Sequence, residues 1–126
     1  MKSVNKVILV GNVANDVYYA EDANKNPRAT FSLATNREWQ SNLGEKKQST
    51  EFHNVCCWGA LAELVNSYVK KGHPIYIEGF LKTRSTEKNG TKQFRCEIVV
   101  ENLIMLNQRE VKNDPIGNPA AELARV

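Results

Sequence analysis

The chain has 126 residues, of which 41% are hydrophobic and 25% are charged, and its formal net charge is +3. This balance is typical of one globular domain and excludes a disordered or fibrous chain. No apolar run approaches the roughly 20 residues that cross a bilayer, and the N-terminus lacks the apolar stretch of a signal peptide, so we expect a cytoplasmic location. The three cysteines, Cys56, Cys57 and Cys96, are predicted to be reduced thiols, because their odd number and spacing fit neither a disulfide framework nor a CxxC metal pair.

The first half of the chain predicts three β-strands. Residues 4–10 are rich in β-branched side chains, which favour a strand. Residues 15–27 are polar and turn-rich, which predicts a loop with room for a short strand. Residues 28–37 alternate as a second strand does, residues 40–48 form a flexible polar loop, and residues 50–58 resume strand character.

The second half predicts one helix and a hairpin. The spacing typical of an amphipathic helix is found at Leu61, Leu64, Val65, Tyr68 and Val69. Gly72 is the expected C-cap of this helix, behind the basic pair Lys70 and Lys71. Residues 75–81 read as the next strand, and Asn89-Gly90 predicts a type I′ turn that pairs this strand with residues 92–100.

The order of elements predicts the fold. A sole helix between the third and fourth strands of a five-stranded set is typical of an all-β OB-fold, a partly open Greek-key barrel. The periodicity stops after Leu106, so we expect the domain to comprise residues 1–106 and a short, loosely ordered tail to comprise residues 107–126.

Catalysis finds no support in the sequence. The only histidines, His53 and His73, are linked by no pattern to a nucleophile or a metal-ligand set. The chain also lacks a Gly-rich phosphate loop, a paired-carboxylate motif and a CxxC motif. We therefore predict a non-enzymatic protein without a cofactor or metal.

Aromatic and basic residues interleave along the predicted strands, which favours nucleic-acid binding. Bases stack on aromatic faces and cations follow the phosphates. Trp39 lies beside Arg37 in a strongly polar stretch, and Phe52 and Trp58 share one face of the third strand. The alternative is that each ring belongs to the core, and we assign Phe31 to the core for that reason.

A second group of candidate contacts lies on the fourth strand. Phe80, Lys82 and Arg84 share one face, opposite the apolar face of the same strand. Because Phe80 alternates with charged residues, we expect its ring to be a binding surface and the two cations to contact phosphate. Tyr68 of the helix is assigned to the core. Lys70 and Lys71 have an equally good alternative as a solvated helix end.

Several ordered blocks resemble a known family. They are Val4-Asn5-Lys6-Val7-Ile8-Leu9-Val10-Gly11-Asn12, Leu33-Ala34-Thr35, Thr50-Glu51-Phe52-His53-Asn54-Val55, Trp58-Gly59-Ala60-Leu61-Ala62-Glu63 and Gly72-His73-Pro74-Ile75-Tyr76-Ile77-Glu78-Gly79. Together they resemble bacterial single-stranded-DNA-binding protein from about residue 4 to residue 106. The resemblance implies an OB-fold protomer, most often a homotetramer, that binds and protects single-stranded DNA without strong sequence preference during replication, recombination and repair.

The resemblance also implies roles for individual residues. The stacking positions of the family are aromatic here, as Trp39, Phe52 and Trp58. The basic positions along its DNA path match Lys47, Lys71, Lys82 and Arg84, and we add Arg37 because it adjoins Trp39. The subunit interface of the family corresponds to His53, Tyr76 and the nearby Lys6.

Some positions depart from the family pattern. A fourth stacking aromatic of the family is replaced by Thr86, while Asn54 and Ala60 stand where the family often has basic residues. These changes predict weaker binding or a different DNA path, offset by Phe80. The chain also ends without the long linker and acidic Pro-Phe tip of the family, so we do not expect that route of recruiting replication and repair proteins. Host and phage origins both stay open.

Three alternatives stay open at this stage. A primosome-type accessory protein would be a shorter OB-fold dimer. A structural OB-fold would use its aromatics only for an oligomer interface and would show no salt-sensitive oligonucleotide binding. A cold-shock-like RNA-binding role is also compatible with the residues, because stacking does not distinguish the sugars.

Overall fold

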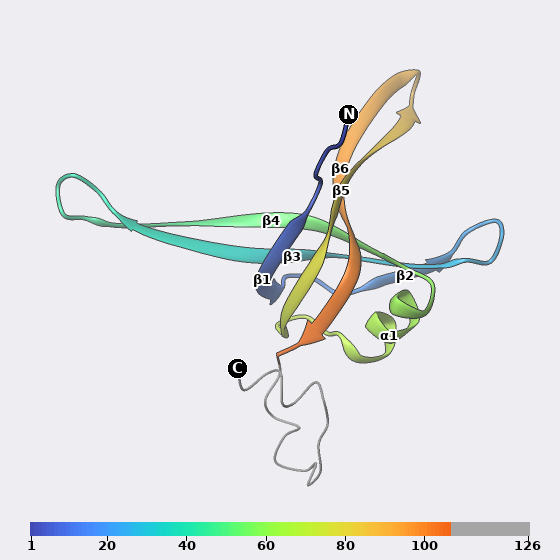
Figure 1. Ribbon diagram of the computed structural model, residues 1–126, viewed down its shortest axis with the longest axis horizontal. Helices are drawn as coiled ribbons and strands as arrows, with labels where there is room; N and C mark the ends of the chain where they lie inside the picture. Colours follow the sequence, from blue (N-terminus) through green and yellow to red (C-terminus); the bar gives the residue numbers. More distant parts are fainter. Residues whose placement is uncertain (107–126) are drawn as a thin grey trace, which may run out of the picture.

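The computed structural model describes residues 1–106, so the predicted tail of residues 107–126 lies outside the described residues. Figure 1 shows a small barrel from which two long hairpins project. The elements, in chain order, are β1 (Val7–Val13), β2 (Tyr18–Glu21), β3 (Pro27–Gln40), β4 (Lys46–Trp58), α1 (Ala60–Tyr68), β5 (Pro74–Lys88) and β6 (Thr91–Met105). In this part of the chain no helix is long and apolar enough to span a membrane.

Five strands close into a barrel. The sheet order is β1-β5-β6-β4-β3-β2, and a further pairing of β1 with β3 closes it. All the pairings are antiparallel except that of β4 with β6, and the short β2 is attached to the outside of β3. The one helix of residues 1–106, α1, lies between β4 and β5, the third and fourth barrel strands, so the predicted OB-fold is confirmed.

The core is formed by the inward face of each strand and by one stripe of α1. The buried side chains include Val13, Ala29, Phe31, Leu33, Val55, Cys57, Ala62, Val65, Val69, Ile75, Ile77, Ile98 and Val100. The assignment of Phe31 to the core is confirmed, because its exposed fraction is only 4%. Gly79 also lies inward, where an added Cβ would overlap the carbonyl oxygen of Val99 on β6.

The predictions for the helix end and for Tyr68 were wrong. The helix stops at Tyr68, and Val69 is already extended, so Gly72 is not its C-cap. Gly72 has a φ of 92° in the turn to β5, where its N–H donates to the carbonyl of Val13. The buried stripe consists of Ala62, Val65 and Val69, which leaves Tyr68 beside it with an exposed fraction of 61%.

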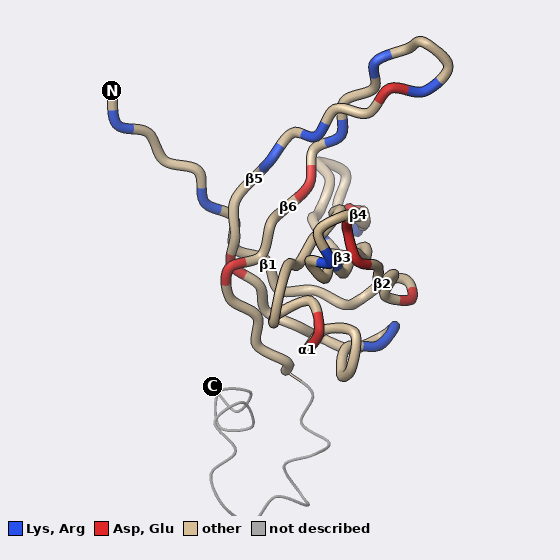
Figure 2. Tube along the Cα trace, turned by 90° about the vertical axis from the view of Figure 1, so that its right-hand side faces the viewer, with Lys and Arg blue, Asp and Glu red and all other residues tan. Residues whose placement is uncertain are grey.

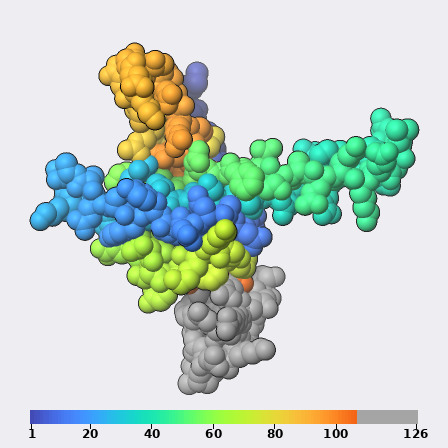
Figure 3. Space-filling model, turned by 180° about the vertical axis from the view of Figure 1, so that it is seen from behind, coloured from blue at the N-terminus to red at the C-terminus, as the bar shows by residue number. Residues whose placement is uncertain are grey.

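The two hairpins extend well beyond the barrel (Figure 1). β3 and β4 stay paired out to Gln40 and Lys46, so residues predicted as a flexible loop form regular strands around a short tip. We call residues 36–51 the β3–β4 arm and residues 82–97 the β5–β6 arm. The predicted type I′ turn closes the second arm, with φ values of 53° at Asn89 and 76° at Gly90. Figure 3 shows both arms standing free of the barrel surface.

Candidate nucleic-acid interface

A groove of about 540 Å³ lies between the strands at the base of the two arms. We call it the central groove. Its walls come from the segment after β1 and from all the later strands, β2 to β6. The lining residues are Asn15, Asp16, Tyr18, Arg28, Thr30, Phe31, Ser32, Asn54, Val55, Arg84, Thr86, Gln93, Arg95 and Glu97. OB-folds bind oligonucleotides over the second and third barrel strands and the adjoining loops, which is the region that this groove occupies.

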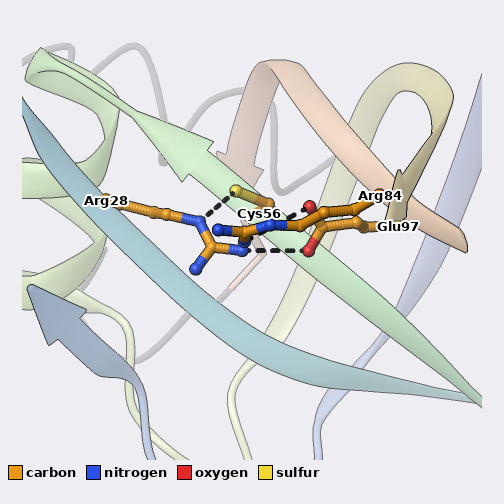
Figure 4. Close-up of polar contacts among 4 residues, drawn as sticks. All are labelled: Arg28, Cys56, Arg84 and Glu97. Carbon is orange, nitrogen blue, oxygen red and sulfur yellow. Dashed lines mark hydrogen bonds and ion pairs between the residues drawn. The ribbon is translucent and has the colours of Figure 1, made fainter. Parts of the chain in front are cut away.

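An ionic cluster lies in the wall of the central groove (Figure 4). The guanidinium of Arg28 on β3 donates to the carboxylate of Glu97 on β6, with an Nη2–Oε2 distance of 3.1 Å. Its Nε donates to the Sγ of Cys56 at 3.3 Å. Arg84 of β5 reaches the other oxygen of the same carboxylate at 3.9 Å. Glu97 therefore lies between two arginines.

Arg28 also touches one of the predicted stacking residues. Its Cζ atom lies 5.5 Å from the centroid of the Trp58 ring, which is within cation–π range. The two residues face each other directly across the β3–β4 pairing. Trp58 keeps an exposed fraction of 40%, so part of its ring remains open to a ligand.

The pairing register of β4 places Phe52 and Trp58 on one face of the strand, as predicted. Phe52, Asn54, Cys56 and Trp58 alternate on the face that pairs with Ala34, Ser32, Thr30 and Arg28 of β3. Phe52 is exposed on this face, whereas Cys56 is buried beneath Arg28. Burial raises the pKa of the Cys56 thiol, which keeps it protonated at neutral pH. The third barrel strand, β4, thus carries two exposed aromatic rings, Phe52 and Trp58.

A second concave site lies near the tip of the β3–β4 arm. It has a volume of about 410 Å³ and is lined by Glu38, Trp39, Gln40, Lys46, Lys47 and Gln48. Trp39 faces Lys47 across the strand pair, and the Arg37 guanidinium lies 5.8 Å from the Trp39 ring centroid. Lys47 itself is 3.4 Å from the carboxylate of Glu45, an exposed ion pair of little strength. This site, the arm-tip cleft, combines one aromatic ring with two lining cations, Lys46 and Lys47, and Arg37 lies beside the ring.

The predicted face of β5 continues into the β5–β6 arm. Phe80 is half-buried opposite Val99, while Lys82 and Arg84 lie opposite Glu97 and Arg95 on the same face. Figure 2 shows Lys and Arg positions spread along this arm. Of all the predicted contacts, only Arg84 lines the central groove.

The residues predicted for the subunit interface, Lys6, His53 and Tyr76, do not form one cluster. Lys6 lies 3.1 Å from the carboxylate of Glu78, and the Tyr76 hydroxyl donates to the other oxygen of that group. The hydrogen bonds from Tyr76 and Lys6 lower the pKa of Glu78, because both stabilise the ionised carboxylate. The same hydrogen bond to Glu78 raises the pKa of Tyr76, because the phenol must keep its proton to donate. His53 of β4 instead forms a hydrogen bond with the hydroxyl of Thr35 on β3, at 2.8 Å. Lys71 is exposed in the turn after α1 and lines neither the central groove nor the arm-tip cleft.

Two residues of this region, Arg28 and Glu97, were missed by the sequence reasoning. Arg28 and Glu97 are separated by 69 positions and meet only because β3 and β6 flank β4. Phe94 is exposed on β6, opposite Ser85. Phe94 adjoins Arg95 in an otherwise polar run, the same sequence pattern that marks Trp39.

The closed barrel, with a charged groove between its arms and exposed rings beside it, defines a binding protein built on an OB-fold. Comparison with known proteins identifies it further. The chain belongs to the single-strand binding protein family, which it matches over residues 4–106. This membership confirms the prediction that the protein is not an enzyme.

The relatives and solved structures agree with this family. The chain is 38% identical over 122 residues to single-stranded DNA-binding protein 1 of Xylella fastidiosa, covering 94% of this chain and 88% of the relative. It is 37% identical over 111 residues to single-stranded DNA-binding protein 1 of Chlorobaculum tepidum, covering 86% and 68%. A structure of the Plasmodium falciparum SSB in complex with ssDNA has a TM-score of 0.78 and 31% identity, covering 85% of this chain and 98% of that one.

Proposed function

We propose that this protein binds single-stranded DNA through base stacking on exposed aromatic rings and phosphate contacts from Lys and Arg. The observation that carries the proposal is the pairing of each tryptophan with an arginine: Trp58 beside the central groove is paired with Arg28, and Trp39 of the arm-tip cleft is paired with Arg37. Both rings are partly open to solvent. A partly exposed ring beside a cation suits a nucleotide, which offers a π-face and a negative charge.

The proposed contact residues divide by chemistry. Trp39, Phe52, Trp58 and the half-buried Phe80 are the stacking surfaces, and Phe94 is a further exposed ring on the second arm. The proposed phosphate contacts are Arg37, Lys47, Lys71, Lys82 and Arg84. We assign all of these contacts to residues 1–106, as the single-stranded-DNA-binding domain. The biological setting that fits is the bacterial cytoplasm, where replication, recombination and repair expose single strands.

Tryptophan fluorescence tests the proposal, because Trp39 and Trp58 are the only tryptophans. The protein is titrated with oligo(dT), with a duplex of equal length and with oligo(rU), each at low and high salt. Quenching by the single DNA strand but not by the duplex, weakened at high salt, supports the proposal. Tighter binding of oligo(rU) would favour the RNA-binding alternative.

A lack of response to any of these nucleic acids would favour a structural role. If the wild type is quenched, Trp39→Phe and Trp58→Phe assign the signal to one tryptophan or the other. Each variant leaves one tryptophan and keeps an aromatic ring at the substituted position. Quenching that survives in both variants places both rings in the DNA path.

We propose further that the protomers assemble, with a homotetramer as the expected state. The outer face of β1 carries Ile8 and Val10, each with an exposed fraction of 57%. The register places Val10 beside Tyr76 and places Ile104 on the far side of Tyr76, so apolar side chains extend across three strands. Such a surface is typical of a contact between subunits.

Light scattering during size-exclusion chromatography tests the assembly. Val10→Glu puts a charge in the apolar face and is expected to lower the measured mass toward that of a smaller assembly. Val4→Glu is the control, because Val4 is exposed and lies ahead of β1. A wild-type dimer would favour the primosome-type alternative, and a wild-type monomer would contradict the assembly proposal.

A further inference from the structure

The carboxylate of Glu97 is the centre of the ionic cluster in the central groove. Its side chain has an exposed fraction of only 13%, and each oxygen faces a different arginine. Figure 4 shows the two guanidinium groups converging on this carboxylate from β3 and β5. In the groove wall, a negative group is therefore fixed between two of the cations that line the same groove.

The two arginines are held unequally. Among residues 1–106, Arg28 has three partners: the carboxylate at 3.1 Å, the Cys56 sulfur at 3.3 Å and the Trp58 ring at 5.5 Å. In the same part of the chain Arg84 has only the carboxylate, at 3.9 Å, and its side chain has an exposed fraction of 45%. An ion pair at that distance and exposure is weak. Arg84 is thus the member of the cluster that can leave it.

A phosphate group is a better partner for Arg84 than this distant carboxylate is, because arginine and phosphate form short bidentate hydrogen bonds. The carboxylate cannot move away to make room, since Arg28 holds it in the wall. It remains beside any phosphate that reaches Arg84, where it attracts the same guanidinium and repels the phosphate.

We propose that Glu97 competes with DNA phosphate for Arg84 and thereby lowers the affinity of the central groove for single-stranded DNA. The inference rests on the proposed function, in which Arg84 contacts phosphate. Arg28 stays with Glu97 in the complex and keeps its place over Trp58. The cluster then has one fixed arginine and one exchangeable arginine on a single carboxylate.

Glu97→Gln tests the inference, because glutamine keeps an acceptor for Arg28 and removes the charge. Binding of a labelled oligo(dT) is measured by fluorescence anisotropy over a range of salt concentrations. We expect binding roughly threefold to tenfold tighter at low salt, with a smaller gain at high salt. Glu87→Gln is the matched control: it lies on the same arm, is exposed, and forms no ion pair within residues 1–106. A gain as large in this control would overturn the inference.

A double-mutant cycle identifies the arginine. Glu97→Gln should tighten binding in the wild type but have little effect in an Arg84→Gln background, and an undiminished gain there would contradict the inference. Arg84→Gln alone should lower the slope of log affinity against log salt by about 0.7. An unchanged slope would refute the inference even if Glu97→Gln failed to fold. Failure of the wild type to bind oligo(dT) would instead refute the proposed function.

Discussion

Trp58→Ala removes the proposed stacking surface beside the central groove. Trp58 has an exposed fraction of 40%, and a large aromatic side chain buries about 150–250 Å², so a stacked base covers roughly 60–100 Å² of its surface. At about 25 cal/mol per Å², this area corresponds to about 1.5–2.5 kcal/mol of binding free energy. The range agrees with the roughly 1–3 kcal/mol measured for base–aromatic stacking. We therefore expect affinity for oligo(dT) to fall by a factor of about 10–70.

The assay is an anisotropy titration with labelled oligo(dT) at a salt concentration that keeps the wild-type dissociation constant measurable. Trp58→Phe is the control, because it keeps an aromatic face and should lose only a small part of the affinity. Urea unfolding of each variant shows whether a loss of binding comes from a loss of stability. We expect the variants to fold, because Arg28 retains its contacts with Glu97 and Cys56 when the ring is removed. A folded Trp58→Ala protein with less than a twofold loss would refute the stacking role.

Three further predictions concern stability, ionisation and reactivity. Gly79→Ala should lower the free energy of unfolding by about 1–3 kcal/mol in urea titrations, because its Cβ would overlap the backbone of β6; an unchanged midpoint would contradict this. Tyr76→Phe should raise the Glu78 pKa toward its ordinary value, as measured by a carbon NMR titration. The ionised carboxylate stabilises the fold above its ordinary pKa, and this stabilisation is lost as the pH falls through the lowered pKa. The variant should therefore have a smaller stabilisation of this kind. Iodoacetamide should alkylate native protein at Cys96 alone, since burial raises the Cys57 pKa to about 12; mass spectrometry should find three adducts only after unfolding.

The sequence predicted the barrel because its signals are local. The stripe of α1 and the Asn89-Gly90 turn are each set by residues near one another in the chain, and the inward strand faces are apolar. The arms were underestimated for a physical reason: both faces of an arm strand contact solvent, so no hydrophobic alternation marks it. Residues 46–48 were therefore predicted as part of a loop although they are fully paired.

The candidate site was predicted in part, for the same reason. The shared face of Phe52 and Trp58 follows from strand alternation alone, and the register of β4 reproduces it. Contacts between strands were out of reach, because pairing register depends on the whole barrel. The Arg28–Trp58 and Arg28–Glu97 contacts both require that register, and without it Arg28 was only the first residue of a strand.

The distribution of charge gives the two arms different parts in binding. The β3–β4 arm has three cations and three carboxylates, so it is neutral, whereas the β5–β6 arm has five cations and two carboxylates, an excess of three. Phosphate attraction therefore comes mainly from the second arm, and stacking on Trp39 comes from the first. Counterion release scales with the number of phosphates neutralised, at about 0.7 per contact for a single strand, so three uncompensated cations support a slope near 2. A neutral arm contributes little to that slope, because each phosphate attracted by its cations is repelled by its carboxylates. Its one ring, Trp39, can therefore bind a base at salt concentrations that weaken the other arm.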